Sequence, residues 1–311
     1  MRALLTGGSS LTEPWFARAV HARGCHAVTA LRRLCDEYAE SIRVQRAIEL
    51  KNVAECIFGI ASGDAQFPNL CKRERWDLPC HHAAEVGNCR SPTFDVERAV
   101  AANTRNFPVV PRGIRGVAGE VLTGSVFGAS EGEGTPPLDA FSPYGGSKGL
   151  TATLIRQLRS GARASFRKFV TPNDPFGSYE EPRFCAYFMR QWQSGEVGEV
   201  RAPAYVRDNI HVDLLTGTCA RFAESVPGGP APIRVSPSLY AERQGAFRGR
   251  LHAATYNRFG HDRCLVLREQ TEFTKPRIRV NTACTEMRDW NEDAAWDAIP
   301  SFCGPTPTNT K

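Results

Sequence analysis

The chain has 311 residues, a formal net charge of +6 and 41% hydrophobic residues, which is typical of one large globular domain or two of ordinary size. Its basic residues are spread along the sequence instead of forming a tail, and no apolar stretch approaches the ~18 residues of a membrane-spanning helix. We therefore expect neither nucleic acid nor a membrane as a partner. Eleven cysteines without a C-x-x-C pair, and an N-terminus without a signal-like apolar stretch, indicate reduced thiols and a cytoplasmic location.

Short apolar runs typical of β-strands alternate with segments long enough for helices in the first part of the chain. The runs lie at 2–6, 26–31, 55–60, 76–83, 120–127 and 166–171. Such alternation favours an α/β fold with a Rossmann-like, doubly wound parallel sheet covered by helices on both faces. We predict one domain over 1–172, joined by parts of 209–235.

After residue 172 proline and glycine become frequent and the alternation is lost. Segments with helical character remain near 180–194, 212–225, 238–252 and 292–299. We predict that 173–311 forms mainly a smaller, irregular C-terminal region.

The sequence TGGSSLTEP at 6–14 follows the first predicted strand and precedes a segment with helical periodicity. Free N–H groups and the dipole of a helix N-terminus favour a phosphate at such a turn. In the spacing Gly-x-x-Gly-x-x-Gly, Gly7 holds the first place, while Ser10 and Glu13 hold the second and third. A carboxylate at the third place is expected to lie close to the phosphates. The residues predicted to bind cofactor phosphates are Gly7, Ser9, Ser10 and Leu11.

Two arginines, Arg32 and Arg33, follow the second predicted strand, where an enzyme that prefers NAD usually carries an acidic residue for the ribose 2′-hydroxyl. Arginine at this point suits a 2′-phosphate, so we expect NADP or NAD as the cofactor, with NADP favoured. Two solvated arginines after a strand remain the alternative interpretation.

Tyr144 and Lys148 in YGGSK lie four residues apart on a helix predicted to begin near Pro143, so their side chains share one face. A cation close to a phenol favours the phenolate and should lower the tyrosine pKa. A hydroxyl from Thr123 or Ser125, at the end of the preceding predicted strand, would hold a substrate alcohol while Tyr144 removes its proton.

With these motifs the chain resembles the extended short-chain dehydrogenases/reductases, the NAD(P)-dependent nucleotide-sugar epimerases and dehydratases, over roughly residues 1–300. HHAAEVG at 81–87 is similar to the family's His-x-Ala-Ala segment, and RDNIHVDLL at 207–215 is close to family form. The resemblance implies that 1–172 binds NAD(P), that 173–311 mainly binds a nucleotide-sugar substrate, and that the protein is a homodimer. Cofactor contacts implied by it, besides the loop, are His81, Ala83, Ala84, Asn103, Tyr144 and Lys148.

The resemblance also implies catalytic roles. Tyr144 is the base, Lys148 modulates it and binds the cofactor ribose, and Thr123 is the hydroxyl partner, because the family hydroxyl lies three residues before the valine of V-Y-G. Substrate contacts are expected at Ser125, Asn173 and Arg207.

Several alternatives stay open. Glu13, an apparent insertion at Asp174, and two prolines, Pro108 and Pro111, depart from family form, so an active enzyme and a non-catalytic cofactor-binding relative are both considered. A 4-epimerase or ketoreductase is favoured over a 4,6-dehydratase, because the dehydratases carry Asp-Glu after the hydroxyl residue and this chain has Gly124-Ser125. Glu85 is the nearest acidic candidate by family position, or simply a residue of the cofactor pocket.

No cysteine or acidic residue stands at ligand spacing around His81, His82 or His211, so we expect no metal. Leu150, Leu154 and Leu158 follow one helix face, a pattern that suits either a dimer contact or burial within the monomer.

Overall fold

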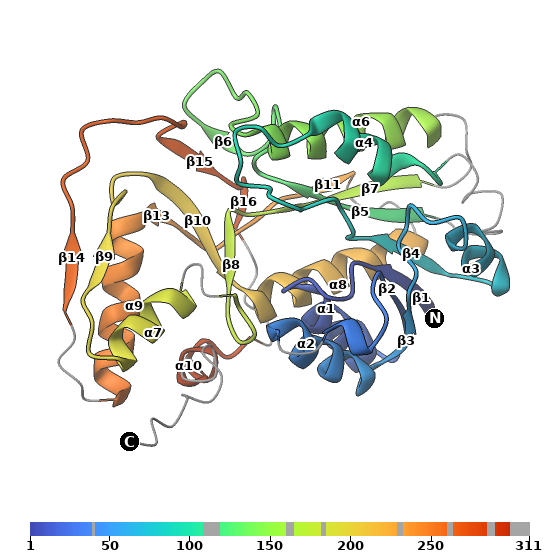
Figure 1. Ribbon diagram of the computed structural model, residues 1–311, viewed down its shortest axis with the longest axis horizontal. Coiled ribbons are helices and arrows are strands. Elements are labelled where there is room, and N and C mark those ends of the chain that lie inside the picture. Colours follow the sequence, from blue (N-terminus) through green and yellow to red (C-terminus); the bar gives the residue numbers. More distant parts are fainter. Residues whose placement is uncertain are drawn as a thin grey trace.

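A seven-stranded parallel sheet forms the centre of the larger part of the molecule (Figure 1). The computed structural model describes residues 1–38, 41–107, 119–159, 165–181, 185–228, 233–259, 264–284 and 290–298. The strand order is β11-β7-β5-β4-β1-β2-β3. The bounds are β1 (Arg2–Thr6), β2 (His26–Leu31), β3 (Ala54–Phe58), β4 (Leu78–His81), β5 (Gly119–Ser125), β7 (Ser165–Thr171) and β11 (Arg234–Val235). This is a doubly wound order, with the direction of winding reversed between β1 and β4.

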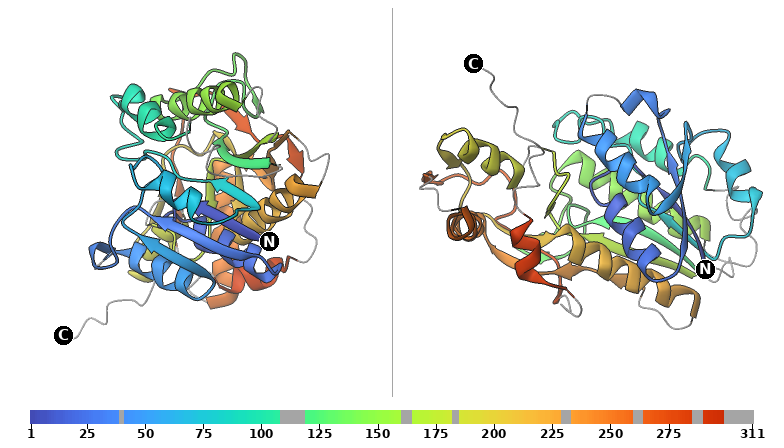
Figure 2. Two further views of the ribbon diagram at one scale, coloured as in Figure 1. Left: turned by 90° about the vertical axis from the view of Figure 1, so that its right-hand side faces the viewer. Right: turned by 90° about the horizontal axis from the view of Figure 1, so that it is seen from below.

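Helices cover both faces of this sheet, which explains why its central strands are buried along almost their whole length (Figures 1 and 2). On one face lie α1 (Glu13–Ala22), α2 (Ile42–Lys51) and α8 (Val212–Gly228), whose apolar side chains share a core with the sheet. On the other face α6 (Pro143–Arg159) packs Ile155 against Leu122 of β5, with α4 (Val96–Thr104) beside it. The short α3 (Phe67–Arg73) and a 3₁₀ turn (Asp36–Tyr38) complete this part.

The predicted α/β class and doubly wound sheet are confirmed, and each of the six predicted apolar runs overlaps a strand of it. The N-terminal helix and the helix beginning at Pro143 also form as predicted. Residues 212–228 form α8 against α1, and β11 pairs with β7 at the sheet edge, so this later segment packs with the first domain.

A smaller sheet organises the second part, with the order β13-β10-β15-β6 and β8 paired to β10. Its strands are β6 (Glu133–Gly134), β8 (Asp174–Phe176), β10 (Val206–His211), β13 (Tyr240–Arg243) and β15 (Ile278–Val280). Two further pairs are β9 (Gly198–Val200) with β14 (Leu265–Leu267), and β12 (Pro237–Ser238) with β16 (Ala283–Cys284). The helices are α7 (Cys185–Gln193), α9 (Gln244–Phe259) and α10 (Glu292–Asp297).

This second part has its own aromatic core, in which Phe176, Trp192, Phe247 and Trp296 are buried. The helix predicted over 238–252 is wrong at its start, because 240–243 pairs antiparallel with β10 and α9 begins only at Gln244. Pairing with an existing strand satisfies backbone groups that a helical turn would otherwise satisfy.

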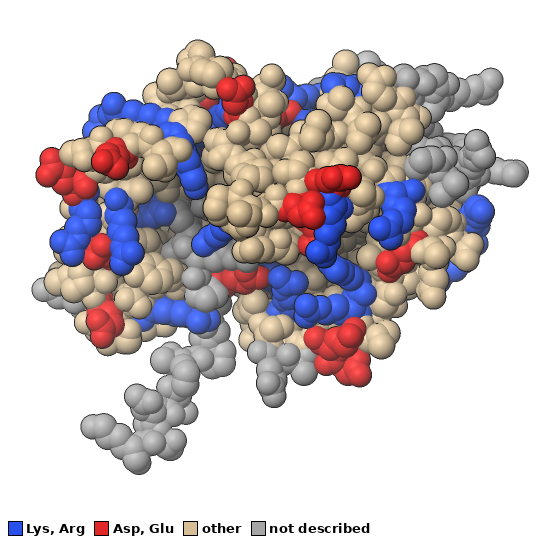
Figure 3. All heavy atoms as spheres, turned by 45° about the horizontal axis from the view of Figure 1, so that its top comes forward, with Lys and Arg blue, Asp and Glu red and all other residues tan. Residues whose placement is uncertain are grey.

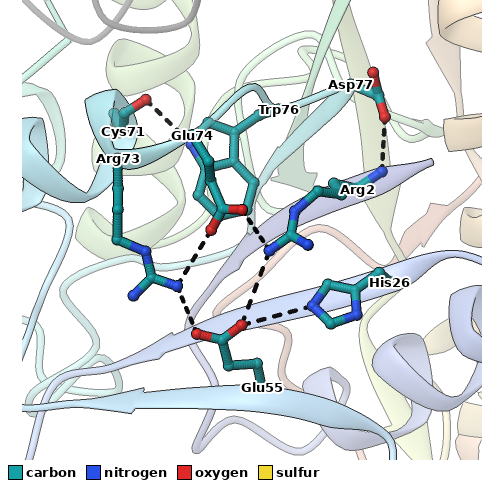
Figure 4. Close-up of polar contacts among 8 residues, drawn as sticks. All are labelled: Arg2, His26, Glu55, Cys71, Arg73, Glu74, Trp76 and Asp77. Carbon is teal, nitrogen blue, oxygen red and sulfur yellow. Dashed lines mark hydrogen bonds and ion pairs between the residues drawn. The ribbon is translucent and has the colours of Figure 1, made fainter.

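A network of charged side chains closes the N-terminal edge of the central sheet (Figure 4). Arg2 of β1 lies 2.5 Å from the Glu74 carboxylate, and Arg73 lies 2.6 Å from Glu55 of β3 and 3.2 Å from Glu74. Asp77 accepts the backbone N–H of Arg2 at 2.8 Å. Each acidic group of this network therefore has a basic or N–H partner.

Candidate functional site

A cleft of about 1700 Å³ opens at the C-terminal ends of the central strands, beside the switch in winding direction between β1 and β4. This is where ligands bind in open α/β sheets. Residues of both parts of the chain line it. The predicted site residues among the lining residues are Gly7, Ser9, Ser10, Leu11, Arg32, Ala83, Ala84, Asn103, Tyr144, Asn173 and Arg207.

The turn after β1 has the conformation that its first glycine permits. Gly7 has a φ of +96°, and a Cβ atom there would lie 3.1 Å from the backbone nitrogen of Ala83, so a side chain would be strained and crowded. The N–H of Ser10 donates to the Gly7 carbonyl at 2.9 Å, and the Ser10 hydroxyl accepts the N–H of Glu13 at 3.3 Å. The Ser10 hydroxyl therefore accepts the N–H of the first residue of α1, while the N-cap residue Thr12 makes no capping bond with its side chain. The backbone of this turn and the Ser10 hydroxyl suit the phosphates of a dinucleotide.

Glu13 does not reach the cleft, in contrast to the expectation that its carboxylate lies near bound phosphates. The side chain is fully buried, and neither of its oxygens has a hydrogen-bond partner among the residues that the structure describes. Burial raises its pKa well above the usual value, and its charge would raise the pKa of the Cys80 and Cys219 thiols. The helix phase turns this side chain into the core between the sheet and α8, where the neutral acid is favoured.

The two arginines after β2 behave differently from each other. Arg32 lines the cleft and is largely exposed. Its guanidinium lies 3.5 Å from the carboxylate of Glu85, which also lines the cleft, and the two form an ion pair. Arg33 is exposed and is not among the lining residues. The Glu85 carboxylate also accepts the N–H of Gly87 at 2.8 Å, so Glu85 is engaged at the mouth of the cleft.

Arg43 and Arg46 of α2 are among the cleft arginines that the sequence analysis did not predict. The buried Arg46 guanidinium donates to the carbonyl of Ser9 at 3.0 Å and to that of Tyr179 at 2.7 and 3.0 Å. It thus joins the glycine loop to the segment after β8. Basic residues on a helix are commonly solvated, so no local pattern around Arg46 predicts this role.

Ala83 and Ala84, two of the predicted cofactor contacts, follow β4 and line the cleft. His81, a third predicted contact, does not line it. His81 is buried, hydrogen-bonded through Nδ1 to Thr6 at 3.1 Å, and packs its ring edge-on to Phe107. Asn103 of α4 is buried at the wall of the cleft, where its Oδ1 accepts the N–H of Glu85 at 2.8 Å. It therefore supports the loop that follows β4.

Tyr144 lines the cleft from the first turn of α6, and its ring stands edge-on to Phe94. Lys148, one turn later, is 7% exposed, and no described residue forms an ion pair with it. Burial, followed by the charge of Lys168, lowers the pKa of Lys148 to about 8. The expected lowering of the tyrosine pKa is wrong, because burial raises the pKa of Tyr144 to about 12.

The hydroxyl residues at the end of β5 are buried beneath the cleft. Thr123 Oγ1 lies 2.5 Å from Nδ1 of His82, a side chain that lines the cleft and that the sequence analysis considered only as a metal ligand. Burial, followed by the charge of Lys148, lowers the pKa of His82 to about 3. Ser125 is 7% exposed and its Oγ accepts the N–H of Phe127 at 3.3 Å. Thr123 and the half-buried His82 are therefore in contact, and the buried Lys148 is near enough for its charge to act on the His82 ring.

The predicted substrate residues Asn173 and Arg207 both line the cleft. Arg207 is nearly buried, and its guanidinium donates to the carbonyls of Val206 at 2.7 Å, Pro276 at 2.8 Å and Arg277 at 3.1 Å. It also stacks over the Tyr205 ring at 4.6 Å. Arg207 is therefore already tied to the backbone of the second part.

Basic side chains predominate over acidic ones among the lining residues. They are Arg32, Arg43, Arg46, Arg90, Arg98, Arg105, Arg201, Arg207, Arg248 and Lys275, against Asp64, Glu85, Glu180, Glu181 and Glu199. Figure 3 shows Lys and Arg side chains in both the left and the right half of the view. A cleft with this balance favours an anionic ligand.

Within the described ranges, no three His, Cys, Asp or Glu side chains are grouped to hold a metal ion. The cysteines whose side chains are described are free thiols. None of the described helices is both long and apolar enough to span a membrane. Pro108 and Pro111 lie outside the described residues, and Asp174 begins β8.

Neither protein-family models nor curated proteins match this sequence. Solved structures match it in fold. UDP-glucuronic acid 4-epimerase from Bacillus cereus, in complex with UDP-glucuronic acid and NAD, has a TM-score of 0.70 at 12% identity, covering 97% of this chain and 99% of that chain. UDP-glucose 4-epimerase from Thermus thermophilus, in complex with NAD, has a TM-score of 0.71 at 15% identity, covering 98% and 100%.

A dTDP-glucose 4,6-dehydratase from Streptomyces venezuelae, with NAD bound, has a TM-score of 0.59 at 20% identity, covering 86% of this chain and 85% of that chain. The present chain therefore has the fold of these nucleotide-sugar enzymes along nearly its whole length. Identities this low establish the fold, while the chemistry has to be argued from this chain's own residues.

Proposed function

We propose that this protein is an NAD(P)-dependent enzyme of the extended short-chain dehydrogenase/reductase family that acts on a nucleotide sugar, as a 4-epimerase or a ketoreductase. The observation that carries the proposal is the position of Tyr144 at the cleft, with Lys148 one turn behind it and Thr123 at the end of β5. The dinucleotide-type turn at Gly7 lines the same cleft. That all of these residues lie at the same end of the central sheet supports the proposal.

The cofactor, when bound, supplies hydride acceptance and donation. Tyr144 holds or removes the proton of the substrate hydroxyl at its phenol oxygen, and Thr123 orients that hydroxyl. Without ligands the phenol is protonated at neutral pH, because burial raises its pKa to about 12. Catalysis by the phenolate therefore requires the complete site to bring this pKa down, and the Lys148 ammonium is the described group on the same helix face that can favour the anion.

The cofactor is proposed to be NADP or NAD, with NADP favoured by Arg32. Its guanidinium is at the cleft and mostly exposed, so it can exchange the 3.5 Å contact with Glu85 for a ribose 2′-phosphate. Arg43 of α2 lines the same cleft. Arg32→Asp should weaken NADP more than NAD, as measured by quenching of protein fluorescence on titration with each cofactor.

Two features favour an epimerase or ketoreductase over a dehydratase. At Gly124, where dehydratases carry an acid, an added Cβ would lie 2.5 Å from the Lys168 side chain, which pairs with Glu131. Glu85, the other acidic candidate, is engaged by Arg32 and by the N–H of Gly87. Neither position offers a free carboxylate for removing water across a C–C bond.

The test is to load the protein with NAD or NADP and assay UDP-, GDP-, CDP- and dTDP-sugars, identifying products by NMR. We expect inversion at C4 or interconversion of a ketone and an alcohol. Cofactor binding with no conversion in the whole panel would favour a non-catalytic cofactor-binding protein. A 4-keto-6-deoxy product would favour the dehydratase.

We also propose a homodimer that pairs through α6. Leu150, Leu154 and Leu158 are 52%, 44% and 46% exposed on this helix, so burial within the monomer does not explain their spacing. Leu154→Glu should convert a dimer into monomers in light scattering at micromolar concentration. A monomeric mass for the unaltered protein would contradict the proposal.

A further inference from the structure

We propose that His82 is a positioning residue that fixes the hydroxyl of Thr123 for the reaction. The inference rests on the proposed function, since it gives His82 a part in the work of Thr123, Tyr144 and Lys148. It concerns a side chain that follows β4 and that none of the sequence motifs required to be a histidine.

The geometry comes from the alignment of two parallel strands. His81 pairs with Leu122 in the register of β4 and β5, so the next residues along, His82 and Thr123, lie side by side. Their side chains meet with Nδ1 and Oγ1 2.5 Å apart. Side chains of directly paired residues on neighbouring strands point to the same face of the sheet. The register of the two strands therefore holds His82 and Thr123 in contact.

Packing limits the movement of the His82 ring. The ring centroid lies 4.6 Å from that of Phe16 in α1, and its buried Nε2 has no hydrogen-bond partner within the described part of the chain. An apolar side chain of similar size would fill this space without leaving a nitrogen unpaired. The cost of keeping histidine here is offset by one visible interaction, the bond to Thr123.

The charge state suits such a role. Burial and the nearby charge of Lys148 hold the His82 ring neutral across the working pH range, with a pKa of about 3. A neutral ring carries one N–H and one bare nitrogen. If Nδ1 bears the proton, it donates to Thr123 Oγ1 and leaves the threonine proton for a substrate oxygen. In the other tautomer Thr123 donates to Nδ1 and offers its lone pairs.

In both tautomers the hydrogen bond to His82 restricts rotation of the Thr123 hydroxyl. Without this bond, the hydroxyl would have to lose that freedom when substrate binds, at a cost in entropy. Substrate alcohol and ketone need different partners, a hydrogen-bond acceptor and a donor respectively. A threonine bonded to a neutral histidine can serve either form. The expected contribution of His82 is therefore to the rate of turnover rather than to cofactor binding.

The test compares His82→Leu, which removes the nitrogen, with His82→Asn, whose amide can replace Nδ1. We expect His82→Leu to lower kcat about tenfold with KM and cofactor affinity changed less than about threefold. His82→Asn should recover most of the loss. In a Thr123→Val background, His82→Leu should cost nothing further, because its partner is already absent.

Full kcat in His82→Leu, equal loss in His82→Asn, or additive losses with Thr123→Val would each overturn the inference. An activity-independent readout is the ¹⁵N imidazole NMR spectrum of the ligand-free protein. Thr123→Val should shift the His82 Nδ1 resonance, and an unchanged resonance would overturn the hydrogen bond itself.

The same experiments separate this inference from the proposed function. Turnover that is lost in Tyr144→Phe but unaffected in His82→Leu overturns the role of His82 alone. Absence of turnover on every nucleotide sugar, with the NMR shift present, overturns the proposed function and with it the part of His82 in the reaction.

Discussion

The two ends of the central sheet differ in the burial and pairing of their charged side chains. At the N-terminal edge Arg2, Arg73, Glu55 and Glu74 pair with one another in half-exposed positions (Figure 4). At the C-terminal ends Lys148 and Thr123 are buried, His82 is half-buried, and burial lowers the pKa values of both Lys148 and His82.

Groups that lower the stability of the fold lie at the C-terminal ends of the central strands. Exposed ion pairs contribute little and cost little. A buried amine without an ion-pair partner lowers stability, and it persists where a reaction needs it. Under the proposed function, the same sheet carries a structural edge and a reactive edge, and substitutions at the two ends should have effects of very different kinds.

The largest expected effect is on the reactive edge. Tyr144→Phe removes the phenol oxygen and keeps the ring that packs against Phe94. Turnover should fall about 10²- to 10⁴-fold, the usual loss on removing a general base, while cofactor and substrate still bind. Steady-state kinetics and fluorescence titration measure the two quantities. A variant with near full turnover would show that another group moves the proton.

Lys148→Met should lower turnover and raise stability at once. Because the folded-state pKa of Lys148 is about 8 and its usual value is 10.5, the unfolded chain binds more protons between these pH values, so the wild type gains stability as pH rises through this window. Below pH 8 the charged amine carries the full penalty. The variant should therefore be more stable at pH 7 by roughly 1–3 kcal/mol.

This advantage of Lys148→Met should shrink from pH 8 to pH 10.5 in denaturant unfolding. The exposed Lys72 at the end of α3 supplies the matched control, and Lys72→Met should change stability by less than about 0.5 kcal/mol. Equal stability of wild type and Lys148→Met at pH 7 would argue that the amine is well solvated.

Glu13→Gln probes a buried acid that lies outside the reactive edge. The pKa of Glu13 is raised in the folded state, so its carboxyl costs stability above the usual pKa of 4.5, and this cost grows as pH rises. The variant should gain about 1–2 kcal/mol at pH 8 and less at pH 5, with cofactor affinity unchanged. Glu97→Gln, in the exposed first turn of α4, is the control.

A uniform gain for Glu13→Gln at both pH values would contradict the assignment of a buried ionisable group. A loss of cofactor affinity would show instead that the carboxyl acts on the glycine loop.

The smallest effect is expected at the structural edge. Arg73→Ala removes contacts to Glu55 and Glu74, yet its side chain is half exposed, so the loss should stay below about 1 kcal/mol and decrease further in high salt. Arg73 lowers the pKa of Glu55, so this small contribution should vanish as pH falls through the carboxylate range. Thermal unfolding at two salt concentrations checks it. A loss of several kcal/mol would mean that the network carries the sheet.

Much of the fold could be predicted because its central strands are continuous apolar runs, and the start of α6 at Pro143 could be predicted from local chemistry. The strands of two to four residues in the second part could not. β8 and β13 are too short to show a period, and each forms because β10 offers a partner.

The candidate site shows the same division. Spacing alone placed Tyr144 and Lys148 on one helix face, but their pKa values depend on burial, which spacing does not reveal. Family pattern pointed to His81, whereas strand alternation turns its neighbour His82 toward Thr123. Arg46 reaches the glycine loop through a tertiary contact that no local pattern encodes.

We propose that residues at the C-terminal ends of the central strands move hydrogen between a nucleotide sugar and a nicotinamide cofactor. The proposal is tested most directly by mixing cofactor-loaded protein with nucleotide sugars deuterated at C4 and measuring the mass of the released nicotinamide dinucleotide. The account predicts that deuterium from at least one sugar appears in the reduced cofactor or returns to C4 of its product, and that Tyr144→Phe slows this exchange by at least about a hundredfold. Deuterium that stays on C4 of every unconverted sugar, with cofactor bound, would contradict it.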